Sequence, residues 1–191
     1  NLDDDTVFLV GEFTAAALPL TVPDGGTAGH YVTIVSCEEQ YDADTDSAAI
    51  LDGGGATPTK TNLMTCNNPY VRLKGITFQD ALQAGSNGAL VLGDAASDVI
   101  IEDCDFEKED YPVASSAGFN GIYTAFGPTD AAQNVTITNC TFSNLAGGTW
   151  CNTAGRGIYV NVQSSIDTLA EYEALTSARI YNGWKIQNCT F

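Results

Sequence analysis

An eight-residue pattern that recurs along the chain constrains its fold more than any other feature. The pattern is apolar-x-apolar-x-polar-Cys-x-Phe, and its copies are VIIEDCDF (99–106), VTITNCTF (135–142), WKIQNCTF (184–191) and the variant VRLKGITF (71–78). The stretch VTIVSC (32–37) is a fifth, degraded copy. Successive first positions of the four full copies are 28, 36 and 49 residues apart. A constant core with variable intervals is typical of a solenoid, because each coil buries its apolar face against its neighbours while insertions leave sideways.

Each copy predicts two short strands joined by a bend. Alternate residues of a strand face opposite sides, so the first and third positions share one face, and the sixth and eighth share another. The fifth position, between the strands, holds residue types that tolerate left-handed backbone angles: Gly75, Asp103, Asn139 and Asn188. A third strand precedes the pair in GALVL (88–92), GIYTAF (121–126) and GIYVNV (157–162). We therefore expect an all-β solenoid of about five coils with three strands per coil.

Stacking such coils would turn equivalent residues into internal columns about 4.8 Å apart. One column is aromatic and consists of Phe78, Phe106, Phe142 and Phe191. Aliphatic columns lie beside it, formed by Val71, Val99 and Val135 and by Leu73, Ile101, Ile137 and Ile186. Burial of each side chain contributes roughly 1.5 to 3 kcal/mol, which allows such columns to support a fold with little helix.

The strand pair NVTITNCTF (134–142), with AAILDGGG (48–55) and YVRLKGITF (70–78), resembles the right-handed parallel β-helix of the pectin-lyase-like superfamily. The resemblance covers roughly residues 7–191 and implies that architecture, which carries lyases, hydrolases, epimerases and non-catalytic surface proteins. Most catalytic motifs of the superfamily's enzymes are missing. The strings nearest to Gly-His-Gly and Arg-Ile-Lys are Gly29-His30-Tyr31 and Arg179-Ile180-Tyr181, and no proline follows an aspartate.

The chain predicts a single domain over residues 1–191, since no linker-like composition interrupts it. The last copy of the pattern ends at Phe191, which would leave a strand edge unpaired, so we expect a piece of a longer chain. One insertion, between Asn161 and Trp184, contains a capping-box-like Ser164 to Asp167 pair. A short helix is expected in that insertion.

The acid excess limits the partners. Acidic residues outnumber basic ones by 24 to 7, for a formal charge of −17, which repels nucleic acid and anionic membranes. No apolar run reaches the roughly 18 residues of a membrane span. We expect an extracellular or cell-surface location with no membrane insertion. Carbohydrate, or other copies and segments of the same surface assembly, are the expected partners.

The cysteines predict packing more than chemistry. Cys104, Cys140 and Cys189 fall in an inward column, where they would act as small buried hydrophobes; a disulfide between neighbouring coils is the alternative. The sequence does not decide whether Cys37 and Cys66 form a disulfide, and it does not determine the pairing of Cys151. The only histidine, His30, has no partner at metal-ligand spacing.

Two tyrosines are candidates for carbohydrate binding. The resemblance implies that sugars lie along outward residues of the first strand of each coil. Aligning the three first strands gives two faces, one with Ala89, Ile122 and Ile158 and the other with Leu90, Tyr123 and Tyr159. If the first face is inward, Tyr123 and Tyr159 form an exposed platform suited to a sugar ring. The alternative is that a neighbouring loop covers both.

Carboxylates supply the remaining candidates. Asp103, Asp105 and Glu107 alternate onto one outer face, where a pair could perform glycosidase chemistry or simply be solvated. In DADTDS (42–47), Asp42, Asp44 and Asp46 have the spacing of a calcium loop, although the glycine and glutamate of such loops are missing. Calcium is therefore the one cofactor candidate, and a plain polar loop is the alternative.

Three sequons mark Asn134, Asn139 and Asn188 as candidate glycosylation sites in a secreted protein. Asn139 and Asn188 also have a structural explanation as bend residues. Together these features predict an extracellular, non-catalytic β-helix segment of a surface, stalk, appendage or adhesion scaffold, with glycan binding as one role. The alternative is a polysaccharide lyase or glycoside hydrolase acting in the groove along the first strands.

Overall fold

The described part of the chain is all-β. The structure is a computed structural model that describes residues 4–37, 48–54, 60–81, 88–107, 120–124, 132–143, 156–160 and 183–191. These residues form sixteen short strands and no helix. No helix within these ranges is long and apolar enough to cross a membrane. The helix expected between Asn161 and Trp184 lies outside the described residues.

The strands form three parallel sheets. The six-stranded sheet contains β1 (Thr6–Leu9), β4 (Val32–Ser36), β7 (Val71–Lys74), β10 (Ile100–Glu102), β13 (Thr136–Thr138) and β16 (Lys185–Gln187). The second sheet contains β2 (Glu12–Phe13), β5 (Ile50–Asp52), β8 (Thr77–Gln79), β11 (Asp105–Glu107) and β14 (Thr141–Ser143). The third contains β3 (Leu20–Thr21), β6 (Met64–Cys66), β9 (Leu90–Leu92), β12 (Asn120–Thr124) and β15 (Arg156–Val160).

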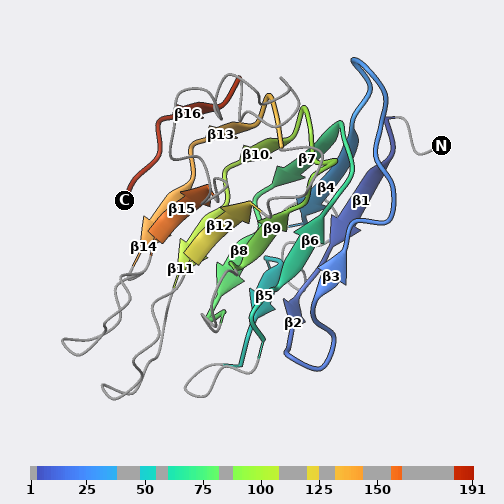
Figure 1. The fold of residues 1–191 in the computed structure, drawn as a ribbon. Helices are drawn as coiled ribbons and strands as arrows, with labels where there is room; N and C mark the ends of the chain where they lie inside the picture. The colour runs from blue at the N-terminus through green and yellow to red at the C-terminus, as the bar shows by residue number, and fades with distance from the viewer. Residues whose placement is uncertain are drawn as a thin grey trace.

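Each sheet consists of every third strand of the chain, so the backbone passes through the three sheets in turn, and each passage forms one coil of the helix. Figure 1 shows the coils following one another along a single axis, with β1 and β16 at opposite ends. The predicted right-handed parallel β-helix with three strands per coil is confirmed. The strands β1 to β3 add a coil at the N-terminal end that the repeat pattern did not reveal. Its bend is the left-handed Gly11, but one residue separates Gly11 from Phe13, where two separate Gly75 from Phe78, so the eight-residue pattern does not align.

The aromatic column is present as predicted. Phe78 stacks on Phe106 and Phe106 on Phe142, with ring centroids 4.8 Å apart in both pairs and planes within 5° of parallel. Phe142 stacks on Phe191 at 4.9 Å. The register explains the geometry, since Phe78, Phe106 and Phe142 are directly paired on neighbouring strands. The column thus extends through four consecutive coils.

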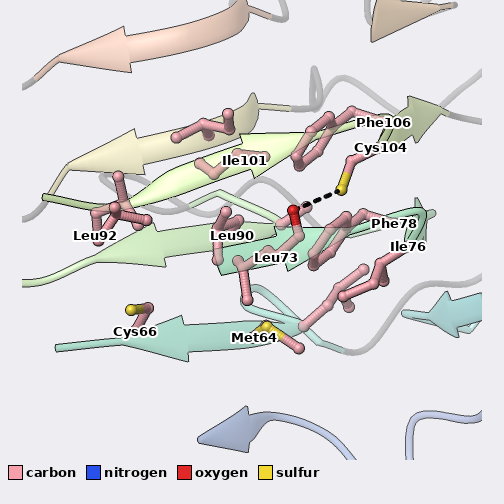
Figure 2. Close-up of a cluster of buried hydrophobic side chains, with 14 of the residues drawn as sticks. Met64, Cys66, Leu73, Ile76, Phe78, Leu90, Leu92, Ile101, Cys104 and Phe106 are labelled. Atoms are coloured by element: carbon pink, nitrogen blue, oxygen red, sulfur yellow. Dashed lines mark hydrogen bonds between the residues drawn. The ribbon is translucent and has the colours of Figure 1, made fainter. Parts of the chain in front are cut away.

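Aliphatic side chains fill the rest of the interior. Figure 2 shows the ring pair of Phe78 and Phe106 beside Leu73, Ile101 and the residues of the third sheet. Side chains of these columns that are fully buried include Val71, Leu73, Val99, Ile101, Val135 and Ile137. Parallel strands in register place like residue on like residue, and this produces a dry core from short strands of only two to five residues.

The bend between the first two sheets has the backbone that the sequence predicts. Gly75, Asp103, Asn139 and Asn188 all have left-handed backbone angles, with φ of 66°, 54°, 53° and 52°. Their side chains form an external ladder, in which Asn188 donates a hydrogen bond to Asn139 (3.4 Å) and Asn139 donates one to Asp103 (3.1 Å). These asparagines are bend residues, because Asn and Asp accept this backbone more readily than other residues with a side chain.

We expect Asn139→Ala to lower the free energy of unfolding by about 1 to 2 kcal/mol more than Asn139→Gly does. Both variants lose the same amide hydrogen bonds, but only glycine adopts the left-handed angles without a Cβ penalty. Urea denaturation of the two variants measures the difference directly. Equal losses would show that the side-chain ladder, and not the backbone angle, determines the residue type at this bend.

The predicted first strands are confirmed, but one of their alignments is wrong. Ile122 pairs with Ile158 and Tyr123 with Tyr159, as expected. Leu90, however, pairs with Ile122, and Val91 pairs with Tyr123. The sequence alignment matched the first glycine of GALVL with the first glycines of the other two strands, which displaced GALVL by one residue. In a strand, such a displacement exchanges the two faces. The buried column of Met64, Leu90 and Ile122 sets the register instead.

Candidate functional site

A polar cavity lies at the corner between the first and second sheets. Its volume is about 290 Å³, and three successive coils line it through Val35, Ser36, Lys74, Gly75, Thr77, Asp103 and Asp105. The corner is accessible from outside, since the side chains of Lys74 and Asp103 are 47% and 44% exposed. The cavity brings together two of the three carboxylates that the sequence singled out, and it adds a lysine.

The lysine is held between carboxylates. Lys74 Nζ lies 3.5 Å from Glu102 Oε1 and 3.6 Å from Asp103 Oδ2. Asp103 Oδ1 accepts the hydrogen bond from the Asn139 amide. Asp103 is thus fixed in place by the neighbouring coils on both sides, because one of its oxygens faces the lysine and the other faces the amide.

The third carboxylate stands apart. Glu107 lies at the far end of β11 and does not line the cavity. Asp105 begins the same strand and is exposed. Strand alternation does place Asp105 and Glu107 on one outer face, with Phe106 buried between them. Of the predicted trio, only Asp103 and Asp105 contribute to one site.

The expectation of an exposed tyrosine platform is wrong for Tyr123. This side chain is only 5% exposed, and every residue of β12 is buried. The alternative, in which the ring is covered, is therefore the observed arrangement. The side chain of Tyr159 is outside the described part of the structure, although its backbone pairs with that of Tyr123. The outward column of the third sheet consequently offers no open tyrosine at Tyr123.

The sequon asparagines are engaged in bends. Asn134 also has a left-handed backbone (φ 53°), and its amide donates to Asp98 Oδ1 at 3.2 Å. Asn139 and Asn188 belong to the corner ladder. A glycan on Asn139 would replace one hydrogen of the amide that bonds to Asp103. The geometry therefore explains why asparagine occurs at these positions without invoking glycosylation.

Metal candidates find no support among the described residues. Asp42, Asp44 and Asp46, the calcium-loop candidates, lie outside them. Within the described ranges, no group of three or more histidine, cysteine, aspartate or glutamate side chains could hold a metal ion. His30 pairs instead with Asp4, Nδ1 to Oδ2, at 2.6 Å on the surface.

The thiols form the predicted inward column. Cys104 and Cys140 are buried and Cys189 is half-buried, and all three are free. Each donates to the carbonyl oxygen two residues earlier, at 3.3 to 3.4 Å. Figure 2 shows the longer contact from Cys104 to the Leu73 carbonyl of the preceding coil. Cys37 and Cys66 are also free, so the bridge left open between them does not form. Cys151 lies outside the described residues.

Burial governs the acidity of two thiols. It raises the pKa of Cys66 from 9.0 to about 11. It also raises the pKa of Cys104 well above its usual range, and the adjoining Cys140 thiol acts in the same direction. A thiol with a raised pKa carries little thiolate at neutral pH and is a poor nucleophile. These cysteines are core residues.

Comparison with known proteins supports the architecture. A solved structure described as a rhamnogalacturonan lyase superimposes with a TM-score of 0.58 over 98% of this chain, at 13% sequence identity. The fold that the two share is a parallel β-helix, as the three parallel sheets of this chain also show. The chain spans 43% of the length of that lyase. No protein-family model matches the sequence, and no curated protein matches it. At this identity the similarity shows the fold alone.

The sequence did not indicate the roles of Ser36 and Gly75 at the corner cavity. The available signal was the residue type at the bend. Three successive coils have Asp103, Asn139 and Asn188 at this bend, and the coil before them has Gly75. The external ladder therefore lacks a side chain at the Gly75 position. The cavity lies at this rung.

Proposed function

We propose that this chain is a non-catalytic, extracellular β-helix segment: a rigid scaffold of a surface, stalk, appendage or adhesion structure. The observation that carries the proposal is the aromatic column, whose rings stack at 4.8 to 4.9 Å through four coils. Such a column couples each coil to the next along the axis, and the loops project sideways from it. Rigidity along the axis suits a rod that presents other groups.

The chemistry of the described surface agrees with this role. Asp103 is fixed by Asn139 and Lys74, and Glu107 lies away from the cavity. The formal charge of −17 suits a solvated exterior and disfavours nucleic acid as a partner. Further segments of the same assembly and carbohydrate are the partners that we propose.

A polysaccharide lyase or glycoside hydrolase is the second candidate. It is favoured by the superposition on a rhamnogalacturonan lyase and by a cavity that holds one lysine and two carboxylates. A lysine and a carboxylate within one polar cavity are groups that could transfer protons. Substrate would be an acidic or neutral glycan.

Incubation with a panel of polysaccharides, with and without added calcium, distinguishes the two functions. The scaffold proposal expects no new reducing ends and no unsaturated sugar ends above a heat-denatured control. Product that forms with the native chain, and falls at least tenfold in both Asp103→Asn and Asp105→Asn, would overturn the scaffold proposal in favour of the enzyme. Both substitutions keep side-chain size, and Asp103→Asn also keeps an oxygen that can accept from Asn139, so a lost activity would reflect the carboxylate.

A further inference from the structure

The corner cavity exists because the external ladder lacks one side chain. From the C-terminal end, the ladder contains Asn188, Asn139 and Asp103, linked by amide hydrogen bonds. The next rung is Gly75, and the rung after it is Ser36. A Cβ built on Gly75 would lie 3.5 Å from the Ser36 Cβ, which is an ordinary contact. The rung could therefore hold a side chain, and glycine leaves it open.

The groups around this gap have a consistent chemistry. The Asp103 and Asp105 carboxylates accept hydrogen bonds, the Lys74 ammonium donates them, and Thr77 carries a hydroxyl that does both. The Ser36 hydroxyl already accepts from the Ala49 amide at 2.7 Å. A ligand at this gap must therefore offer several donors and at least one acceptor over a short distance, as adjacent hydroxyls do.

Charge determines which hydroxyl compound fits. Two carboxylates face the cavity, while the Lys74 ammonium is shared with Glu102 outside it. A carboxylate on the ligand would meet like charges here and would be disfavoured. The volume, about 290 Å³, is just below the roughly 300 to 1,000 Å³ typical of ligand pockets. It suits one sugar ring rather than several.

We propose that the gap at Gly75 is a binding site for a single neutral sugar residue, held through adjacent hydroxyls by Asp103, Asp105 and Lys74. The site goes beyond the scaffold role and requires no catalysis. It would place a sugar at the corner between β7 and β8, between the coils of Ser36 and Asp103. The ligand would occupy the rung that Asn139 and Asn188 fill in later coils.

The decisive variant is Gly75→Asn. Asparagine occupies the equivalent bends at Asn139 and Asn188 with φ near the 66° of Gly75, so the variant should still fold while its side chain fills the gap. Its urea midpoint should be somewhat lower than that of the parent chain, because a residue with a Cβ is strained at this backbone angle. Asp105→Asn tests the carboxylate. Glu107→Gln is the matched control, because it removes the same charge from the same strand outside the cavity.

Binding is measured by amide chemical-shift titration with free glucose, galactose, mannose and rhamnose, with galacturonic acid and with calcium chloride. We expect at least one neutral sugar to shift the amides of Gly75 and Asp103. Gly75→Asn and Asp105→Asn should each weaken that binding at least tenfold, and Glu107→Gln should leave it within twofold.

Several results would overturn the site. No shift with any neutral sugar would do so, as would binding to folded Gly75→Asn that matches the parent chain. A response to calcium or galacturonic acid alone would assign a different ligand class to the cavity. None of these outcomes affects the scaffold proposal, which depends on product formation from polysaccharides.

Discussion

Replacing Phe106 by alanine is expected to lower the free energy of unfolding by about 3 to 5 kcal/mol. Phe106 is fully buried and its ring is stacked at 4.8 Å on both faces, by Phe78 and Phe142. The variant loses the transfer free energy of the ring, leaves a cavity between two rings, and breaks two aromatic contacts worth about 0.5 to 1.5 kcal/mol each. Urea denaturation followed by far-ultraviolet circular dichroism measures the loss.

Asp105→Ala is the matched control for Phe106→Ala. Asp105 precedes Phe106 in β11 and is exposed, so its replacement should change stability by no more than about 0.5 kcal/mol. Phe106→Leu, which keeps an apolar side chain in the column, should lose less than half as much as Phe106→Ala. A loss below about 1 kcal/mol for Phe106→Ala would mean that the column is not what couples the coils.

The architecture could be predicted because the repeat combines three independent signals. Phe106 and Phe142 mark the inward column, Ile101 and Ile137 mark the alternating strand, and Asn139 marks the bend. Each signal is local in the sequence, and the fold needs only their repetition. The coil of β1 to β3 was missed because it has one residue fewer between its bend, Gly11, and its phenylalanine, Phe13, which breaks the eight-residue spacing.

The candidate site was less predictable, because it depends on register and on what neighbouring coils contribute. Strand alternation alone placed Asp105 and Glu107 together, yet only Asp105 lines the cavity. Tyr123 was a candidate for an open face, with a covered ring as the alternative, and strand alternation could not decide between the two; the residue is buried. The residue that best indicates the site is Gly75, because a glycine at this bend leaves an opening where the later coils have a side chain.

Alkaline pH is expected to destabilise the fold through its buried thiols. Burial raises the pKa of Cys66 from 9.0 to about 11, so between these values the unfolded chain has released a proton that the folded chain retains. The stability that the protonated thiol contributes is therefore fully present below pH 9 and is lost as pH rises through this window. The difference between these two pKa values corresponds to a loss of about 2 to 3 kcal/mol in the free energy of unfolding from Cys66 alone. Cys104, whose pKa is also raised by burial, acts with the same sign, and Cys140, whose pKa is lowered by its hydrogen bond with Cys104, acts with the opposite sign.

Urea denaturation at intervals from pH 8 to pH 11, with a reductant present, measures this loss. The free energy of unfolding of Cys66→Ala should fall by about 2 to 3 kcal/mol less across the window than that of the parent chain, because the variant has no thiol proton to retain. Met64→Ala, which removes a fully buried side chain from the same strand but no thiol, should be less stable at every pH with the parent's slope. The two variants separate lost packing from lost proton binding. A parent slope retained in Cys66→Ala would show that the alkaline sensitivity arises elsewhere and that the Cys66 thiol is accessible to water.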